Sequence, residues 1–220
     1  LLNIPRPDRI EAFDNSHTHG TDPVSAMVTF VDGTPRKSDY RKYRLTTAAA
    51  HDDYGAMAEV IRRRYQRLLK DQLPLPNLIV VDGGKGQMSV AYEILKHELD
   101  LNIPLIGLAK DDKHGTQTLL YGHPPVEVPL KKNGEVFQLL SRIQEEVHRF
   151  AITFHRQVRS KSAFQSKLDH VVGLGPKRKR NLLMHFGSIE HMKNATVEEL
   201  MQAKLPQKVA EQVHQLLKDE

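Results

Sequence analysis

The feature that most constrains the fold of this chain is a short, wholly apolar run at residues 78–81, which ends at Asp82. Four consecutive apolar residues are typical of a strand in a sheet that helices cover on both faces, because neither face then meets water. Gly83 and Gly84 allow a tight exit from the strand. A second run of this kind occupies residues 105–109. We therefore expect a sheet buried between helices.

Helical and strand-like patterns surround these two runs. Three strand-like segments joined by short turns come first and predict an antiparallel meander, at residues 10–13, 26–31 and 37–45. Apolar residues at helical spacing predict helices over residues 53–69 and from about 87 to 99. Residues 118–121 and 126–130 predict a hairpin near the surface. This order of elements favours an α/β domain.

The last third of the chain has a helical pattern. An unbroken apolar stripe predicts a long helix from near Glu135 to beyond Val158. Residues 161–167 are polar and predict a linker. Residues 168–220 contain short helical stretches interrupted by glycines and a proline, which predicts a small all-α unit. We therefore expect an α/β domain over residues 1–160, the linker, and an all-α domain over residues 168–220.

Composition and charge exclude several classes of protein. No apolar run approaches the roughly 18 residues that a membrane span requires, and the absence of cysteine excludes disulfides, thiolate metal sites and a cysteine nucleophile. The first residues carry charge and prolines in place of the apolar core of a signal peptide. The chain also lacks an initiator methionine, so we expect it to be part of a longer protein. The net charge of +5 is too small to identify a polyanionic partner.

Two acidic residues follow predicted strands. Asp14 ends the segment at residues 10–13, and Asp82 ends the apolar run. If the two strands are neighbours, the carboxylates converge, and a divalent metal is the usual means of offsetting their repulsion. Taken singly, each residue is more simply explained as a turn or a helix cap.

The segment from Asp82 to Gln87 is a second candidate site. Its glycines and Lys85 at a helix start could contact a nucleic-acid phosphate, although the spacing of a Walker A loop is absent. A tight turn with an exposed Lys85 is the simpler interpretation. A phosphate-loop nucleotide hydrolase remains a third functional alternative that rests on this segment.

The long helix carries further candidates. His148 and His155 lie about two turns apart and share a face, and Glu145 and Glu146 lie one turn or less before His148. An imidazole there could ligate a metal or activate a water, whereas a histidine that hydrogen-bonds the backbone is the simpler alternative. Arginines recur every seven residues on this helix, at Arg142, Arg149 and Arg156. They form either a phosphate-binding stripe or a solvated helix face.

The tail contains a specific short signal for DNA binding. Gly173 and Gly175 allow a tight turn between helices, and four basic residues follow at once: Lys177, Arg178, Lys179 and Arg180. This arrangement is typical of a helix-hairpin-helix, which grips the DNA backbone without reading sequence. A structural helical hairpin is the alternative. A second hairpin around Pro206 lacks the glycines, and we expect it to complete the fold and to bind DNA more weakly than the first.

Taken together, these segments resemble a known family. The motifs occur in the family's order at residues 13–17, 52–57, 62–65, 78–87, 106–110, 146–156 and 171–180. They resemble the C-terminal half of UvrC, the nuclease subunit of bacterial nucleotide excision repair, over essentially the whole chain. The resemblance implies an RNase H-like mixed β-sheet flanked by helices, followed by a tandem helix-hairpin-helix domain.

The resemblance also implies an activity and a site. In the family this half cuts the damaged strand on the 5′ side of the lesion with an Asp-Asp-His triad, which maps onto Asp14, Asp82 and His148, with His155 as second choice. Asp53 lies in a family motif and could support the site or cap its helix. The implied cofactor is Mg2+ or Mn2+, and one metal or two would fit. The implied partners are UvrB and double-stranded DNA with a lesion, bubble or nick, in the bacterial cytoplasm and within the SOS response, with no membrane.

The chain departs from the family pattern at some positions. Asn15 stands where a hydrophobic residue is common. Gln144, Glu145 and Glu146 stand where Arg-Asp-Glu is common, so a local acidic role would shift to Glu145. The family's GIY-YIG nuclease domain and UvrB-binding segment have no counterpart in these residues, so we expect this chain alone to perform neither the 3′ incision nor normal recruitment. The hypothesis is a metal-dependent DNA endonuclease, and the competing one is a non-catalytic DNA-binding or docking module.

Overall fold

The computed structural model describes residues 2–16, 24–46, 52–110, 117–131, 134–187 and 189–218. His17, the last residue of the first family motif, lies outside these ranges. The chain forms two compact units, Leu1–Arg156 and Gln157–Glu220, and each is described by itself. None of the described helices combines the length and the apolar character needed to cross a bilayer.

The first unit is built on one eight-stranded mixed sheet. Its strands are β1 (Arg9–Ser16), β2 (Val24–Val31), β3 (Thr34–Pro35), β4 (Arg41–Arg44), β5 (Leu78–Asp82), β6 (Leu105–Lys110), β7 (Gln117–Tyr121) and β8 (Val126–Val128). The order across the sheet is β3-β2-β1-β5-β6-β7-β8, with β4 also paired to β2. β1, β5 and β6 run parallel, and the remaining pairs are antiparallel. The predicted α/β fold with a mixed sheet is confirmed.

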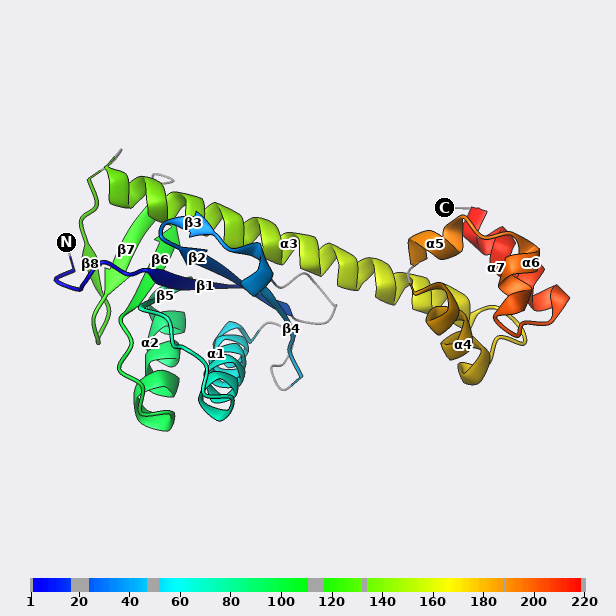
Figure 1. The fold of residues 1–220 in the computed structure, drawn as a ribbon, viewed down its shortest axis with the longest axis horizontal. Helices are drawn as coiled ribbons and strands as arrows, with labels where there is room; N and C mark the ends of the chain where they lie inside the picture. Colours follow the sequence, from blue (N-terminus) through cyan, green and yellow to red (C-terminus); the bar gives the residue numbers. More distant parts are fainter. Residues whose placement is uncertain are drawn as a thin grey trace. The chain divides into compact units, whose positions relative to one another are not determined.

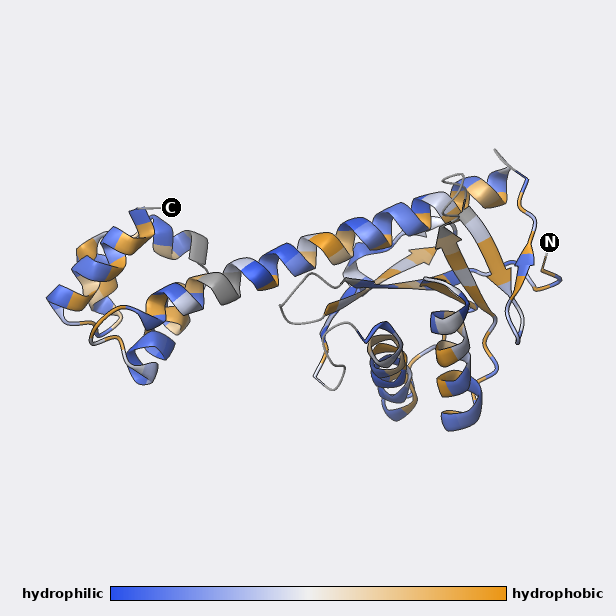
Figure 2. Cartoon of the chain, turned by 180° about the vertical axis from the view of Figure 1, so that it is seen from behind, coloured by the Kyte–Doolittle hydropathy of each residue, from blue (hydrophilic) through white to orange (hydrophobic). Residues whose placement is uncertain are grey.

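Helices cover both faces of this sheet (Figure 1). α1 (Asp53–Lys70) and α2 (Lys85–Glu93), which continues as the π-helical turn η2 (Ile94–Glu98), pack on one face, and α3 (Glu135–Asp169) packs on the other. Because side chains alternate along a strand, Phe13 and Val81 face α1 and α2, whereas Ala12 and Val80 face α3. β5 and β6 are accordingly among the most hydrophobic elements of this unit, which shows orange strands in its sheet (Figure 2).

The predicted meander differs from the structure in detail. Residues 37–45 are not one strand: Lys37–Asp39 form the 3₁₀ turn η1, and β4 begins at Arg41. The turn is stabilised by side chains, since Ser38 Oγ donates to Asp39 Oδ1 at 3.1 Å and Arg9 Nη1 donates to Asp39 Oδ2 at 2.7 Å. Such local hydrogen bonds compete with pairing in a ladder.

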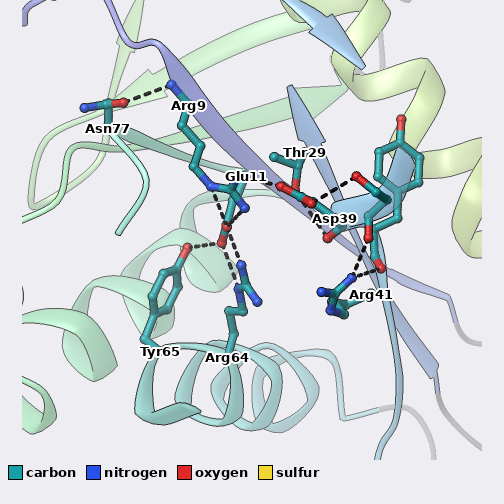
Figure 3. Close-up of polar contacts among 10 residues, drawn as sticks. Arg9, Glu11, Thr29, Asp39, Arg41, Arg64, Tyr65 and Asn77 are labelled. Carbon is teal, nitrogen blue, oxygen red and sulfur yellow. Dashed lines mark hydrogen bonds and ion pairs between the residues drawn. The ribbon is translucent and has the colours of Figure 1, made fainter. Parts of the chain in front are cut away.

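A buried polar cluster fastens α1 to β1 (Figure 3). The Glu11 side chain is fully buried and accepts hydrogen bonds from Arg64 Nη2 at 2.6 Å and Nε at 3.0 Å, and from the Tyr65 hydroxyl at 3.2 Å. Arg9 contributes a further ion pair at 3.1 Å. Burial, reinforced by the Glu11 carboxylate, raises the pKa of Tyr65 well above its usual value, so the phenol stays a donor. A buried carboxylate needs such partners, because removing one leaves an uncompensated charge.

The second unit has its own apolar core. The end of α3 packs there with α4 (Pro176–Phe186), α5 (Ile189–Lys193), α6 (Val197–Gln202) and α7 (Gln207–Lys218). Residues 161–167, predicted as a linker, lie inside α3, and the two units divide at Arg156 and Gln157. The helix continues because Phe164 and Leu168, one turn apart, are both buried in the second core.

Candidate metal centre

Strand register brings the two acidic residues together. β1 and β5 are parallel neighbours that pair as far as Phe13 with Val81, so Asp14 and Asp82 are the next residues on each strand. Alternation turns both carboxylates to the α3 side, the side of Ala12. β1 itself continues past Asp14, because its antiparallel pairing with β2 extends to Ser16. Asp14 therefore lies near the strand's end rather than at it.

α3 supplies the third member of the group. His148 Nδ1 lies 3.1 Å from Asp14 Oδ2. One ligand atom from each of Asp14, Asp82 and His148 lies within 4.8 Å of the others, and within the described ranges the structure assembles one such group of three. The Asp14 side chain is 9% exposed and the His148 side chain 51% exposed. The group therefore rests on the core at one end and is open to solvent at the other.

The donor set suits a divalent cation. Two carboxylate oxygens are the hard ligands that Mg2+ prefers, and an imidazole nitrogen extends the set toward Mn2+ and related ions. Without a cation between them, adjacent carboxylates repel each other. The residues present therefore fit the expected metal, and the open side leaves room for water and substrate ligands.

A neutral side chain completes the arrangement, and sequence reasoning missed it. Gln144 is 6% exposed, and its Nε2 donates to Asp82 Oδ1 at 2.5 Å. Residues four apart share a helix face, so Gln144 lies one turn before His148 on α3. This spacing of four residues from His148 is the sequence signal that could have identified Gln144. Glu145, to which the sequence assigned the local acidic role, is exposed and outside the group of three.

Comparison with known proteins identifies the family. A family model described as the UvrC RNase H endonuclease domain matches residues 1–152. The chain belongs to this family. The resemblance inferred from the motifs is confirmed over this range, and with it the RNase H-like character of the mixed sheet. The UvrC-family assignment makes the first unit an endonuclease domain.

Solved structures of endonuclease V show a partial likeness to the chain. Human endonuclease V has 15% identity and a TM-score of 0.41, with 71% of this chain and 86% of that chain covered. Endonuclease V of Ciona intestinalis, in complex with a 24mer DNA containing an inosine, has 11% identity and a TM-score of 0.41 over 70% and 88% of the two chains. A Ciona variant with a 23mer DNA has 21% identity and a TM-score of 0.35. That match covers 48% of this chain and 47% of that one, less than half of either.

The remaining acidic and histidine candidates of this UvrC-family domain lie outside the group of three. Asp53 is exposed at the first turn of α1, whose N-cap is Asp52. Glu146 accepts from the Tyr40 hydroxyl at 2.9 Å and from Arg149 at 2.8 Å. The Arg149 guanidinium, with a smaller contribution from Tyr40, lowers the pKa of Glu146. His155 is buried, two turns beyond His148.

The basic candidates in the first unit differ in whether their side chains already contact other residues. Lys85 is the first residue of α2, is 62% exposed, and has Glu127 as a distant partner at 3.9 Å. Arg142 donates to the Gly33 carbonyl at 3.3 Å, and Arg149 is held by Glu146. Arg156 is exposed. The predicted arginine stripe thus contains one guanidinium that an acidic neighbour already engages.

In the second unit, the four basic residues after the glycine turn also have different roles. Gly173 has φ of +84°, Gly175 caps α4, and Arg178 Nη1 donates to the Gly173 carbonyl at 2.7 Å. Lys179 is 16% exposed and binds Asp169 and the Gln165 carbonyl, so it stabilises the fold. Lys177 and Arg180 are exposed and have no partner among the residues that the structure describes.

Proposed function

We propose that this chain hydrolyses a phosphodiester of DNA as the endonuclease domain that makes the 5′ incision of nucleotide excision repair. The observation that carries the proposal is the convergence of Asp14, Asp82 and His148 within 4.8 Å in a UvrC-family endonuclease domain. The open side of the group, where His148 is half exposed, gives a DNA strand access to it.

Each residue of the group has a role that follows from its surroundings. Asp14 and Asp82 would hold Mg2+ or Mn2+, with His148 as a further ligand or as general base. When bound, the cation would supply Lewis acidity at the scissile phosphate and lower the pKa of the attacking water. The contact with Asp14 fixes the orientation of the imidazole, and Gln144 fixes that of the Asp82 carboxylate.

The basic residues would hold the DNA backbone. Lys85, Arg142 and Arg156 would contact phosphates near the cut, and the tail would bind the flanking duplex as a tandem helix-hairpin-helix. A duplex with a lesion, bubble or nick is the proposed substrate, and UvrB is the proposed partner of the longer protein. The proposed setting is the bacterial cytoplasm and the SOS response.

The test is incision of a lesion-containing or pre-nicked duplex by full-length protein, with Mg2+ and Mn2+ varied. Asp14→Asn and Asp82→Asn should each lower the 5′ incision rate by more than about 100-fold, the upper end of what outer partners of a metal contribute. DNA affinity should stay nearly unchanged, because the phosphate contacts remain. Cutting at the wild-type rate by either variant would contradict the proposal and leave a DNA-docking module as the function.

A further inference from the structure

A cleft of about 410 Å³ lies where α1 and α2 begin. Asp52, Asp53 and Tyr54 line it from the start of α1, and Lys85, Gly86 and Gln87 line it from the start of α2. Its volume lies in the range of roughly 300–1,000 Å³ that is common for sites of small ligands. Of the residues that line it, Lys85 alone was given a DNA contact above, to a backbone phosphate, and no role above uses the cleft itself.

The cleft adjoins the candidate metal centre through the chain on both sides. On β5, Asp82 precedes Lys85 by three residues. On β1, Asn15 follows Asp14 directly, and its Nδ2 donates to the Asp53 carbonyl at 3.4 Å. The cleft therefore lies beyond the same edge of the sheet as the triad, on the side of α1 and α2, whereas the triad carboxylates face α3. A DNA strand that crosses this edge with its scissile phosphate at the triad would bring a neighbouring nucleotide to this cleft.

Tyr54 offers a fixed aromatic surface in the cleft. Tyr54 is 57% exposed and is one of the exposed large apolar residues of the described chain. The ring rests on the backbone of Gly86, where an added Cβ would lie only 2.5 Å from Tyr54 Cε1. Glycine at position 86 thus permits the ring to lie against α2. The Tyr54 hydroxyl has no hydrogen-bond partner within the described part of the chain.

The charges of the lining select the kind of ligand. Two carboxylates, Asp52 and Asp53, against the single cation Lys85 make the cleft poorly suited to enclose a phosphate group, although Lys85 itself would contact one on the passing backbone. A nucleobase fits better, because its amino and imino groups donate to carboxylate and amide oxygens such as those of Asp53 and Gln87. An exposed aromatic ring also stacks on any base, since every base has a π-face.

We propose that this cleft binds one base of the strand being cut, unstacked from its neighbours, with the Tyr54 ring as its stacking platform. The inference rests on the proposed function for the placement of the strand. Stacking on an aromatic side chain changes affinity by roughly 5- to 150-fold per base. Tyr54 is thereby a positioning residue, which fixes the nucleotide beside the scissile phosphate.

The experiment uses a bubble duplex in which 2-aminopurine is moved along the strand one position at a time. Binding of the whole chain is followed in a chelator, so that no cutting occurs. Fluorescence should be quenched strongly at one position next to the incision site. Tyr54→Phe, which keeps the ring, should retain the quench, and Tyr54→Ala should lose it. Leu73→Ala, a change at a similarly exposed apolar residue beyond α1, is the matched control and should quench as wild type does.

An abasic nucleotide at the quenched position tests the same contact from the DNA side with unchanged protein. It should weaken binding by wild type roughly 5- to 150-fold and leave binding by Tyr54→Ala unchanged. Equal losses for the two proteins, or no quenched position in wild type, would overturn the inference. Because these measurements need no metal and no cleavage, they fail or succeed independently of the incision test with Asp14→Asn and Asp82→Asn.

Discussion

At the scale of single residues, Gln144 shows how a neutral side chain can support two converging carboxylates. Its amide donates to Asp82 at 2.5 Å without adding charge to the group. An arginine, the residue common at this position in the family, would instead add a positive charge beside the carboxylate. A glutamine satisfies one lone pair of Asp82 and leaves the remaining oxygen positions for the metal.

Gln144→Met keeps the length of the side chain and removes the donor. We expect it to lower the apparent affinity for Mn2+ by roughly 10- to 100-fold, the usual effect of losing an outer partner of a metal ligand. The measurement is incision rate against Mn2+ concentration. Gln66→Met, at an exposed position of α1, is the control and should follow the wild-type curve. A wild-type curve for Gln144→Met as well would show that the hydrogen bond does not position Asp82.

At the scale of elements, the two hairpins of the tail have similar turns despite different sequences. In the first, Gly173 has φ of +84°, Leu174 is buried, and α4 begins at Pro176. In the second, Lys204 has φ of +64° and Leu205 is buried before α7 begins. The second turn therefore resembles the first, with a lysine in the left-handed region where the first has a glycine.

Lys204→Gly should stabilise the second unit. A residue with a Cβ is destabilised by about 1–2 kcal/mol in this backbone region, and glycine removes that strain. The greater freedom of glycine in the unfolded chain lowers the resulting gain in folding stability by roughly 0.5–1 kcal/mol. The expected net gain is below about 1.5 kcal/mol, measured as slower hydrogen exchange of α6 and α7. Lys204→Ala, which retains the Cβ, should gain nothing. Destabilisation by Lys204→Gly would mean that the lysine itself contributes to the fold.

Among the basic residues at the start of α4, we expect some to bind DNA and others to stabilise the fold. Lys177→Ala removes an exposed cation and should lower duplex affinity, with the salt dependence reduced by about one unit of slope. Lys179→Ala removes the contacts to Asp169 and Gln165 and should instead lower the melting temperature. Fluorescence anisotropy at several salt concentrations and thermal unfolding measure the two effects. The reverse pattern would contradict the assignment.

At the scale of the whole molecule, the sequence predicted those features that depend on local pattern. The apolar runs predicted the strands now labelled β5 and β6. Asp14 on β1 and Asp82 on β5 predicted a shared site if their strands were neighbours, because parallel neighbours end at one edge of a sheet. His148 was reached through the family resemblance, and the structure places it beside Asp14. His155, the second choice for the triad histidine, is buried and lies outside the group of three.

What the sequence did not predict depends on contacts between distant residues. The polar run at residues 161–167 was interpreted as a linker because most of its residues are hydrophilic, yet Phe164 and Leu168 bury against a separate core and extend α3. Lys179 looked like its basic neighbours until its partners Asp169 and Gln165 were placed. The role of Gln144 likewise became visible only with Asp82 in place.

The central claim is that Asp14, Asp82 and His148 together hold a divalent cation. The most direct test is Mn2+ binding to the whole chain, measured by loss of the free-ion electron paramagnetic resonance signal. Asp14→Asn and Asp82→Asn should each weaken binding by more than about 100-fold, and Asp100→Asn, at an exposed acid remote in sequence from the group, should bind as wild type does. Wild-type binding by both Asp14→Asn and Asp82→Asn would contradict the account.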